Sequence, residues 1–258
     1  MANVAAPGAV VKGTELKGKV ALITGAGRNI GRAIALDLAA GGAAIAVNTR
    51  KSRDDAEKVA QEIRDAGGQA DVFMADIVDA DAVNRMVEGI VKRFGKVDIL
   101  VLNASVRKET PFMEMSFEEW KSLISITLDG AFHCTKACLP HMVKAGGGSI
   151  VTLGGANALS GSPKRVHGST GKHGLWGMTR ALAKELGPHG INVNCVVPGP
   201  MIGPAQPGRS PRGDASGVPL GRRVEYEEIA TLTRYLCGPG ARMVSGQLLY
   251  VDGGQQIF

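Results

Sequence analysis

The chain of 258 residues is long enough for one well-buried α/β domain, and its formal net charge is +6. Its Lys and Arg residues are spread without a long basic run and without an aromatic-rich RNA-binding pattern. The charge therefore favours a basic substrate cleft over a nucleic-acid partner. No apolar run approaches the ~18 residues of a membrane span, which argues against a membrane protein.

Residues 1–16 lack the apolar core of a signal peptide and are expected to form a flexible tail. From residue 17 to residue 258, apolar runs alternate with helical patterns. The apolar runs predict strands at 19–24, 43–49, 71–76, 97–104, 148–155, 191–199 and 246–254. The patterns between them predict helices such as 31–42, 52–68 and 79–95. This alternation predicts a single α/β domain with a Rossmann-like, doubly wound parallel sheet of seven strands.

Residues 200–222 interrupt the alternation with five prolines and five glycines. They follow the C-terminal end of a predicted strand, which is where ligands bind in such sheets. A loop of this length in a compact domain is more often a lid than a plain surface loop. We therefore expect a substrate lid at about 200–222, with a surface loop as the alternative.

The four cysteines form no C-x-x-C pair, which is typical of a reduced, cytoplasmic protein. Cys134, Cys138 and His141 fall at i, i+4 and i+7 of a predicted helix, and this spacing could seat a metal ion. A single helix face rarely supplies a closed site. Small apolar thiols in a buried helix face are the favoured interpretation, and no metal site is predicted.

A glycine-rich turn, TGAGRNIG at residues 24–31, follows the first predicted strand. Glycines let the chain turn tightly into the next helix, whose free N–H groups can bind a pyrophosphate. The strand–turn–helix context makes this a strong indication of a nucleotide site. The candidate cofactor-binding residues of the turn are Gly25, Gly27, Arg28, Asn29, Ile30 and Gly31.

With this turn the chain resembles the short-chain dehydrogenase/reductase family, and in particular its 3-oxoacyl-(acyl-carrier-protein) reductase-like members. The family motif is T-G-x-x-x-G-x-G; Thr24, Gly25 and Gly31 match it, whereas Asn29 stands at the middle glycine. Asparagine tolerates positive φ better than most residues, so the turn can survive. The resemblance implies further cofactor contacts from Asp76, Ile77, Asn103, Ala104, Ser105, Pro198 and Gly199.

The choice of nicotinamide cofactor depends on charge at the end of the second strand. An acidic residue there would bind the ribose 2′-hydroxyl and repel a 2′-phosphate. The strand ends Asn48-Thr49-Arg50 without a carboxylate, and Arg28 lies in the glycine turn. Two guanidinium groups suit a phosphate, so NADP(H) is predicted over NAD(H). The alternative is that both arginines are solvated surface residues.

The resemblance also locates positions where the family's catalytic side chains are missing. Lys172 matches the family lysine that binds the ribose and lowers the pKa of a tyrosine four residues earlier. Counted without gaps, the tyrosine position holds Gly168, the substrate-binding serine position Gly155 and the relay asparagine position Thr127. The threonine that contacts the nicotinamide in the family corresponds to Gly203.

Three candidates for the missing chemistry remain. His167 stands next to the vacant position and has a pKa suited to neutral pH, although an ordinary polar residue at a helix start is the alternative. Lys172 could act as the acid if burial lowers its pKa, or serve the ribose only. Thr127, Ser169 or Thr170 could bind an oxygen.

Basic residues are predicted around the mouth of the site, on loops that follow the fourth, fifth and sixth strands. They are Arg107, Lys108, Lys164, Arg165, Arg209 and Arg212. They favour an anionic small-molecule substrate, with solvated loop charge as the alternative.

The sequence therefore predicts an NADP(H)-dependent oxidoreductase acting on a carbonyl, an alcohol or an activated double bond, with an atypical proton relay. The alternatives are a nucleotide-binding sensor or scaffold without turnover, and a non-redox enzyme on the same fold. The resemblance further implies a homo-oligomer, a tetramer or a dimer.

Overall fold

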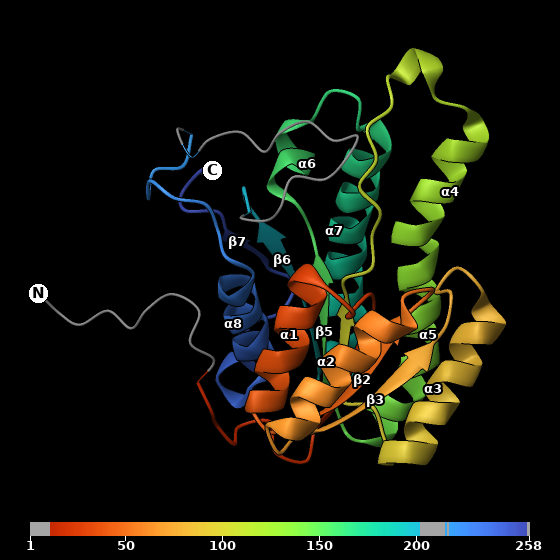
Figure 1. Cartoon of the computed structure of the whole chain (residues 1–258), viewed down its shortest axis with the longest axis vertical. Coiled ribbons are helices and arrows are strands. Elements are labelled where there is room, and N and C mark those ends of the chain that lie inside the picture. The colour runs from red at the N-terminus through yellow and green to blue at the C-terminus, as the bar shows by residue number, and fades with distance from the viewer. Residues whose placement is uncertain (1–10, 202–214, 216, 257–258) are drawn as a thin grey trace, which may run out of the picture.

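The computed structural model describes residues 11–201, 215 and 217–256 and contains a seven-stranded sheet (Figure 1). The strand order is β3-β2-β1-β4-β5-β6-β7, and every neighbouring pair is parallel. The strands are β1 (Val20–Ile23), β2 (Ala44–Thr49), β3 (Gln69–Met74), β4 (Ile99–Leu102), β5 (Gly148–Leu153), β6 (Ile191–Pro198) and β7 (Leu248–Val251). The predicted doubly wound, Rossmann-like fold is confirmed.

Eight α-helices occur in the described residues. They are α1 (Asn29–Ala40), α2 (Arg53–Asp65), α3 (Ala80–Phe94), α4 (Phe117–Thr127), α5 (Asp129–Lys144), α6 (Ala156–Ser160), α7 (Val166–Leu186) and α8 (Tyr226–Cys237). Short 3-10 helices lie at Phe112–Glu114, Gly187–His189 and Pro239–Ala241. Within this part of the chain, none of the helices has both the length and the apolar character required to cross a membrane.

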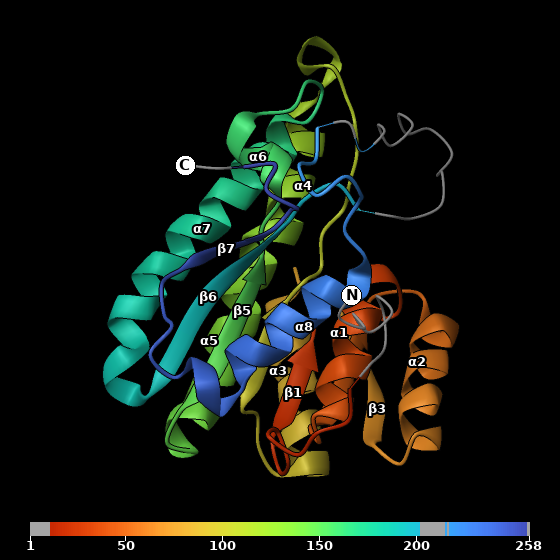
Figure 2. The ribbon, with the colours of Figure 1, turned by 90° about the vertical axis from the view of Figure 1, so that its left-hand side faces the viewer.

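The sheet is covered on both faces, which explains why its central strands are almost entirely apolar. Helices α1, α2 and α8 lie on one face, and α3, α4, α5 and α7 lie on the other (Figure 2). Strand β1 shows the consequence: Ala21 and Ile23 belong to the core under α1 and α8, whereas Val20 and Leu22 belong to the opposite core. All four residues are buried because side chains alternate between the two faces of a strand.

The predicted strand 71–76 is shifted in the structure to Gln69–Met74. Gly67 has φ +89, which lets the chain turn directly after α2 and reach β2 earlier. Gln69 then pairs with Ala44, and Met74 pairs with Thr49. As a result, Asp76 lies just beyond the strand, on the segment that leads to α3.

The N-terminal segment makes contacts before residue 17, where the domain was expected to begin. Leu16 is buried, and its N–H donates to the Gly41 carbonyl at 2.9 Å. Arg234 of α8 donates to Glu15 Oε1 at 2.5 Å and to Asp37 Oδ1 of α1 at 3.0 Å. These bonds attach residues 11–16 to the helical layer of α1 and α8. The first residues of the expected tail lie outside the described residues.

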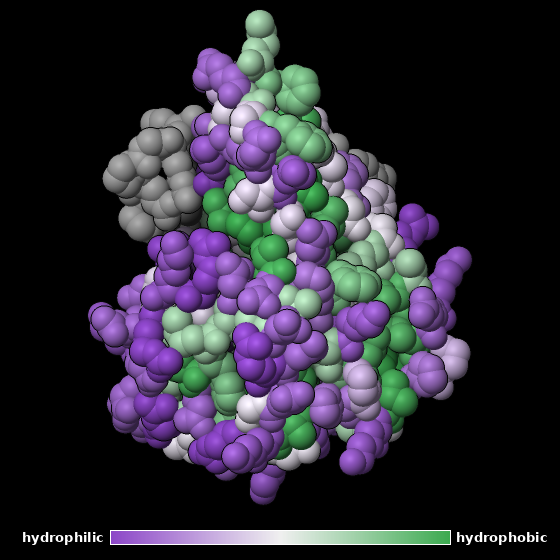
Figure 3. All heavy atoms as spheres, turned by 90° about the vertical axis from the view of Figure 1, so that its right-hand side faces the viewer, coloured by the Kyte–Doolittle hydropathy of each residue, from purple (hydrophilic) through white to green (hydrophobic). Residues whose placement is uncertain are grey.

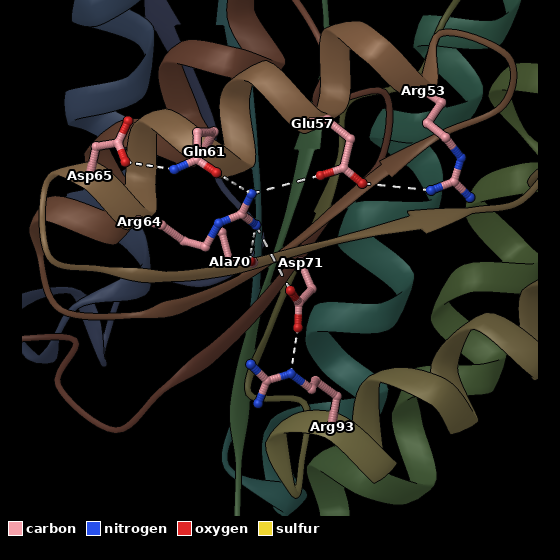
Figure 4. A network of polar contacts seen from close by, with 8 residues as sticks. All are labelled: Arg53, Glu57, Gln61, Arg64, Asp65, Ala70, Asp71 and Arg93. Carbon is pink, nitrogen blue, oxygen red and sulfur yellow. Dashed lines mark hydrogen bonds and ion pairs between the residues drawn. The ribbon is translucent and has the colours of Figure 1, made fainter.

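A second polar network covers the edge of the sheet at β3 (Figure 4). Arg64 of α2 donates to the Ala70 carbonyl at 2.9 Å and lies 3.9 Å from Asp71. Asp71 also accepts from Arg93 of α3. The side chains of Arg64, Asp71 and Arg93 are 36%, 35% and 56% exposed, so each pair contributes at most about 1 kcal/mol. The network mainly shields a strand edge.

We expect a buried ion pair to contribute more to the free energy of unfolding than an exposed ion pair does. Arg234→Ala should lower the free energy of unfolding by about 3 kcal/mol, because it leaves the Asp37 carboxylate buried without its partner. The side chains of Arg234 and Asp37 are only 11% and 8% exposed. Arg32→Ala is the matched control, since the Arg32–Glu62 pair is 41% and 48% exposed. Urea unfolding of both variants measures the difference, and equal losses would contradict this account.

Candidate cofactor and active site

A cleft of about 870 Å³ lies along the carboxyl ends of the strands. Its walls come from the turn after β1, the segments after β2, β3, β4, β5 and β6, and the first turns of α7. The strand order reverses between β1 and β4, and this is where parallel sheets of this type open for a ligand. The cleft therefore occupies the position at which a dinucleotide binds in such folds.

The glycine turn is held in place by hydrogen bonds across the point of reversal. Thr24 Oγ1 accepts from the backbone N–H groups of Asn103 and Ala104, both at 3.0 Å. The Asn103 side chain donates in return to the carbonyls of Thr24 and Gly25, at 2.8 and 3.0 Å. A Cβ on Gly31 would lie 2.4 Å from the Gly25 carbonyl oxygen. Only a glycine allows this close approach.

Asn29 adopts φ +51, the left-handed conformation in which a glycine would be expected. It is the first residue of α1, and Arg28 before it makes no side-chain cap to the helix. The N–H groups of the first turn are therefore not capped by Arg28 and remain available to an anion. The turn residues Gly25, Gly27, Arg28, Asn29, Ile30 and Gly31 all line the cleft.

The region after β2 and β3 combines basic and acidic side chains. Arg50 and Asp76 both line the cleft, with Nη1 of the arginine 3.4 Å from Oδ2 of the carboxylate. The two side chains are 48% and 40% exposed, so the pair is weak and can be opened by a ligand. Also in the lining are Lys51, Ser52, Asp55, Ile77, Ala104, Ser105, Pro198 and Gly199.

The opposite end of the cleft contains open space at two glycines. A Cβ on Gly155 would meet no atom within 4 Å. A Cβ on Gly168 would meet only Nη2 of Arg165, at 3.8 Å. Both glycines line the cleft together with Ser162, Ser169 and Lys172. This end of the cleft, which Lys172 also lines, therefore has room that neither glycine fills.

Lys172 is held by the end of β5. Its Nζ donates to the Leu153 carbonyl oxygen at 2.5 Å. Burial lowers the pKa of Lys172 to about 8, with nearby Cys195 acting against the shift and the charge of Arg165 adding to it. The ammonium and the amine are thus both populated near neutral pH, so Lys172 can gain or lose a proton there.

His167 and Thr127, the other two predicted catalytic residues, do not belong to the cleft lining. His167 is buried, and its Nε2 lies 3.1 Å from the Lys108 carbonyl oxygen. Thr127 Oγ1 donates to the Leu123 carbonyl within α4 and packs against Gly171. The reason is helical: successive residues rotate by about 100°, so with Gly168 facing the cleft, His167 points toward the loop before α4. Burial lowers the pKa of His167.

The predicted basic rim is only partly assembled at the cleft. Arg107 and Arg165 line it, and Arg107 pairs with Glu109 at 3.0 Å. Lys108 and Lys164 do not line it, and Lys108 pairs with Glu119 instead. Arg209, Arg212 and Gly203 lie outside the described residues, as does most of the expected lid at 200–222.

The cysteine-bearing helix packs as a buried face. Cys134 and Cys138 are fully buried, and burial raises the pKa of Cys134 to about 12. His133 Nδ1 bonds to the Ile77 carbonyl at 3.2 Å. Among the described residues, no group of three or more His, Cys, Asp or Glu side chains could hold a metal ion.

Several lining residues were not predicted from the sequence. Lys51, Ser52 and Asp55 directly follow Arg50 and could have been found from that proximity. Tyr226 and Arg223 reach the cleft from the start of α8, far away along the chain. No local pattern in the sequence marks these two.

Comparison with known proteins agrees with this geometry. Residues 25–256 match the family model described as enoyl-(acyl carrier protein) reductase. The chain is 36% identical over 246 residues to a 3-oxoacyl-(acyl-carrier-protein) reductase from Synechocystis sp., covering 95% of this chain and 100% of that protein. The chain belongs to the short-chain dehydrogenase/reductase family. Its curated relatives are named as reductases, and it is an oxidoreductase of this family.

Solved structures of the family superpose closely. A dehydrogenase/reductase from Sinorhizobium meliloti matches with a TM-score of 0.87 and 34% identity, covering 94% of this chain and 96% of that one. A short-chain dehydrogenase from Burkholderia cenocepacia in complex with NADP matches with a TM-score of 0.85 and 30% identity, covering 93% and 99%.

The two ends of the cleft should respond differently to added side chains. Gly155→Ser should change the free energy of unfolding by less than about 0.5 kcal/mol, because the site is open and its φ of 178° is ordinary extended backbone. Gly31→Ala should cost about 1–3 kcal/mol, because the new methyl group would overlap the Gly25 carbonyl. Urea unfolding of both variants decides this. A large loss in Gly155→Ser would show that the space is filled.

Proposed function

We propose that the protein is an NADP(H)-dependent oxidoreductase acting on a carbonyl, an alcohol or an activated double bond of an anionic small molecule. The single observation that supports this most is the open space over Gly155 and Gly168, beside Lys172, at the inner end of a nucleotide cleft. A dinucleotide cleft that ends in unfilled space next to a titratable amine is suited to a second, reacting ligand.

The residues present fit a dinucleotide. The cradle around Gly25 and Gly31 would be filled by any Cβ, and the N-terminus of α1 supplies N–H groups for a pyrophosphate. Asp76 and Ile77 would hold the adenine, and Lys172 would hold the nicotinamide ribose. Asn103 and Ala104 line the cleft beside the glycine turn and would also contact the cofactor. When bound, the reduced nicotinamide supplies the hydride.

NADP(H) is favoured over NAD(H) by charge near the end of β2. Arg28, Arg50 and Lys51 line this region, against the carboxylates of Asp55 and Asp76. Guanidinium groups bind phosphate by paired hydrogen bonds. Asn48, near the end of β2, has no carboxylate for a ribose hydroxyl. Its side chain is also buried, and its amide donates to the Phe73 carbonyl. The NADP complex of the Burkholderia relative supports the same cofactor.

Lys172 is the residue we assign to proton transfer. It lines the cleft beside both glycines, and its pKa is lowered to about 8, mainly by burial. In reduction, its ammonium would give a proton to the substrate oxygen as the hydride arrives; in oxidation, its amine would accept one. Ribose binding and proton transfer are compatible, because the ammonium carries three N–H groups and one goes to Leu153.

A cofactor-binding sensor or scaffold is the alternative, favoured by the same glycines, since neither supplies a proton donor. A non-redox enzyme would need neither the glycine turn nor the basic groups after β2. Consumption of bound NADPH separates turnover from the alternative.

We also propose that the protein is a cytoplasmic homo-oligomer, a dimer or a tetramer. Phe117 of α4 and Phe132 and Val143 of α5 are 65%, 52% and 42% exposed. Figure 3 shows this side of the molecule, where apolar residues lie exposed among polar ones. Burial of such a face between copies would remove it from water. Light scattering should give a multiple of the chain mass.

Replacing Arg50 should reveal the cofactor preference. In Arg50→Ala the affinity for NADPH should fall about 10–100-fold, because a charge-assisted bond to the 2′-phosphate is lost. The affinity for NADH should change little. Arg53→Ala is the control, since Arg53 pairs with Glu57 at 3.6 Å and does not line the cleft. Nicotinamide fluorescence measures both; an equal loss for the two cofactors would contradict the assignment.

Proton transfer by Lys172 should appear in the pH dependence of NADPH consumption, followed by absorbance with a panel of carboxylate-bearing carbonyls and enones. Below a pKa of about 8 the ammonium is present, so reduction should be fastest there and should fall as pH rises above it. Lys172→Arg keeps the charge but cannot release the proton, so turnover should fall about 10²–10⁴-fold and the inflection should vanish.

NADPH binding without consumption at any pH would favour the sensor. An unchanged pH profile in Lys172→Arg would exclude Lys172 as the proton donor.

A further inference from the structure

Arg165 occupies part of the room that a side chain at position 168 would need. It is the residue directly before α7, and its backbone carbonyl accepts from the Ser169 N–H at 2.9 Å, which begins the helix. Its Nη2 lies 3.8 Å from the point where a Cβ on Gly168 would stand. Arg165 and Gly168 both line the cleft. A large side chain at position 168 would therefore compete with the guanidinium for the same space. Gly168 leaves this space to the Arg165 side chain, which lines the cleft.

The space beyond this guanidinium is bounded by groups suited to an anion. Gly155, which also lines the cleft, leaves room, because its Cβ would meet nothing within 4 Å. Lys172 lies one helical turn after Gly168 and also faces the cleft. The N-terminal end of the 21-residue helix α7 adds a partial positive charge to the same region.

The other basic residues expected at the rim lie farther from the space over Gly168. Arg107 lines the cleft and pairs with Glu109 at 3.0 Å, but it has no atom within 4 Å of the Cβ position on Gly168. Lys108 points to Glu119 and does not line the cleft. Lys164 is exposed and does not line it either. Among the described residues that were expected at the rim, only Arg165 has an atom within 4 Å of the Cβ position on Gly168.

We propose that Arg165 is the specificity-determining residue of the site and binds a carboxylate of the substrate in the space over Gly155 and Gly168. A guanidinium and a carboxylate match as planar groups that form two parallel hydrogen bonds, so the arginine orients the ligand as well as attracting it. The inference rests on the proposed function, since it names the anionic group of that substrate and the residue that binds it.

The positive charge of Arg165 affects the pKa values of two nearby side chains. After burial, its charge is among the causes that lower the pKa of Lys172 and of His167. A bound carboxylate would offset this charge and favour the ammonium of Lys172. Binding of the anion would then also increase the population of the ammonium, which is the form that gives a proton in reduction.

Benzoate and benzamide test the proposal, because a benzoic ring fits the volume of a missing tyrosine ring and the two probes differ in charge but not in shape. Ligand-observed NMR titrations would be run on the protein with and without NADP⁺. We expect benzoate to bind about 10-fold or more tightly than benzamide, as a hydrogen-bonded ion pair requires. Arg165→Gln should remove this preference, and Arg165→Lys should retain part of it.

Arg180→Gln is the matched control, since Arg180 is an exposed arginine on the same helix and does not line the cleft. It removes the same net charge and should keep the preference for benzoate. Thermal unfolding checks that Arg165→Gln is folded, and Arg165→Lys provides a second folded variant.

Equal binding of the two probes, no binding of benzoate, or a preference that survives Arg165→Gln would overturn the proposal. These outcomes are separate from failure of the proposed function, because the probes are also titrated without cofactor. Failure of NADP(H) to bind would remove the oxidoreductase assignment while leaving the benzoate preference measurable.

Discussion

The hydrogen bonds between Thr24 and the Asn103–Ala104 segment are the constraint on which the site depends. Thr24 Oγ1 accepts hydrogen bonds from two backbone N–H groups of this segment. The Asn103 side-chain amide donates to two carbonyls of the glycine turn. They join the ends of β1 and β4, where the strand order reverses. The turn, the N-terminus of α1 and the cleft between them all take their positions from this junction. Because these bonds use side chains that are part-buried or buried, the cradle is formed before any ligand arrives.

The fold and the nucleotide half of the site could be predicted because they leave local marks in the sequence. A strand buried on both faces, such as β1, must be apolar throughout, and a turn that approaches another backbone within contact distance must contain glycine, as Gly31 shows. Asn29 was a departure from the family motif, yet its φ of +51° shows that asparagine meets the same conformational need. Such constraints act within a few residues, so sequence patterns reveal them.

The reactive half could not be predicted to the same depth, because it depends on which way each helical residue faces. His167 and Gly168 are neighbours in the chain, but only the glycine lines the cleft. The rotational position of α7, which begins at Val166, is set by packing against α4 and β6 and has no local signature. The same holds for Tyr226, which reaches the cleft only through the docking of α8 on α1. Arg165 is a neighbour whose room depends on Gly168, because its Nη2 lies 3.8 Å from the point where a Cβ on Gly168 would stand.

We propose that a preformed dinucleotide cleft leads to a rebuilt site around Lys172 and Arg165. A fluorescence titration of the purified protein with NADPH, and in parallel with NADH, tests it most directly. We expect saturable binding of NADPH, at least about 10-fold tighter than that of NADH, because of the basic groups after β2. Absence of binding by either nucleotide would contradict it, because the glycine turn and the Thr24–Asn103 bonds would then serve the fold without serving a cofactor.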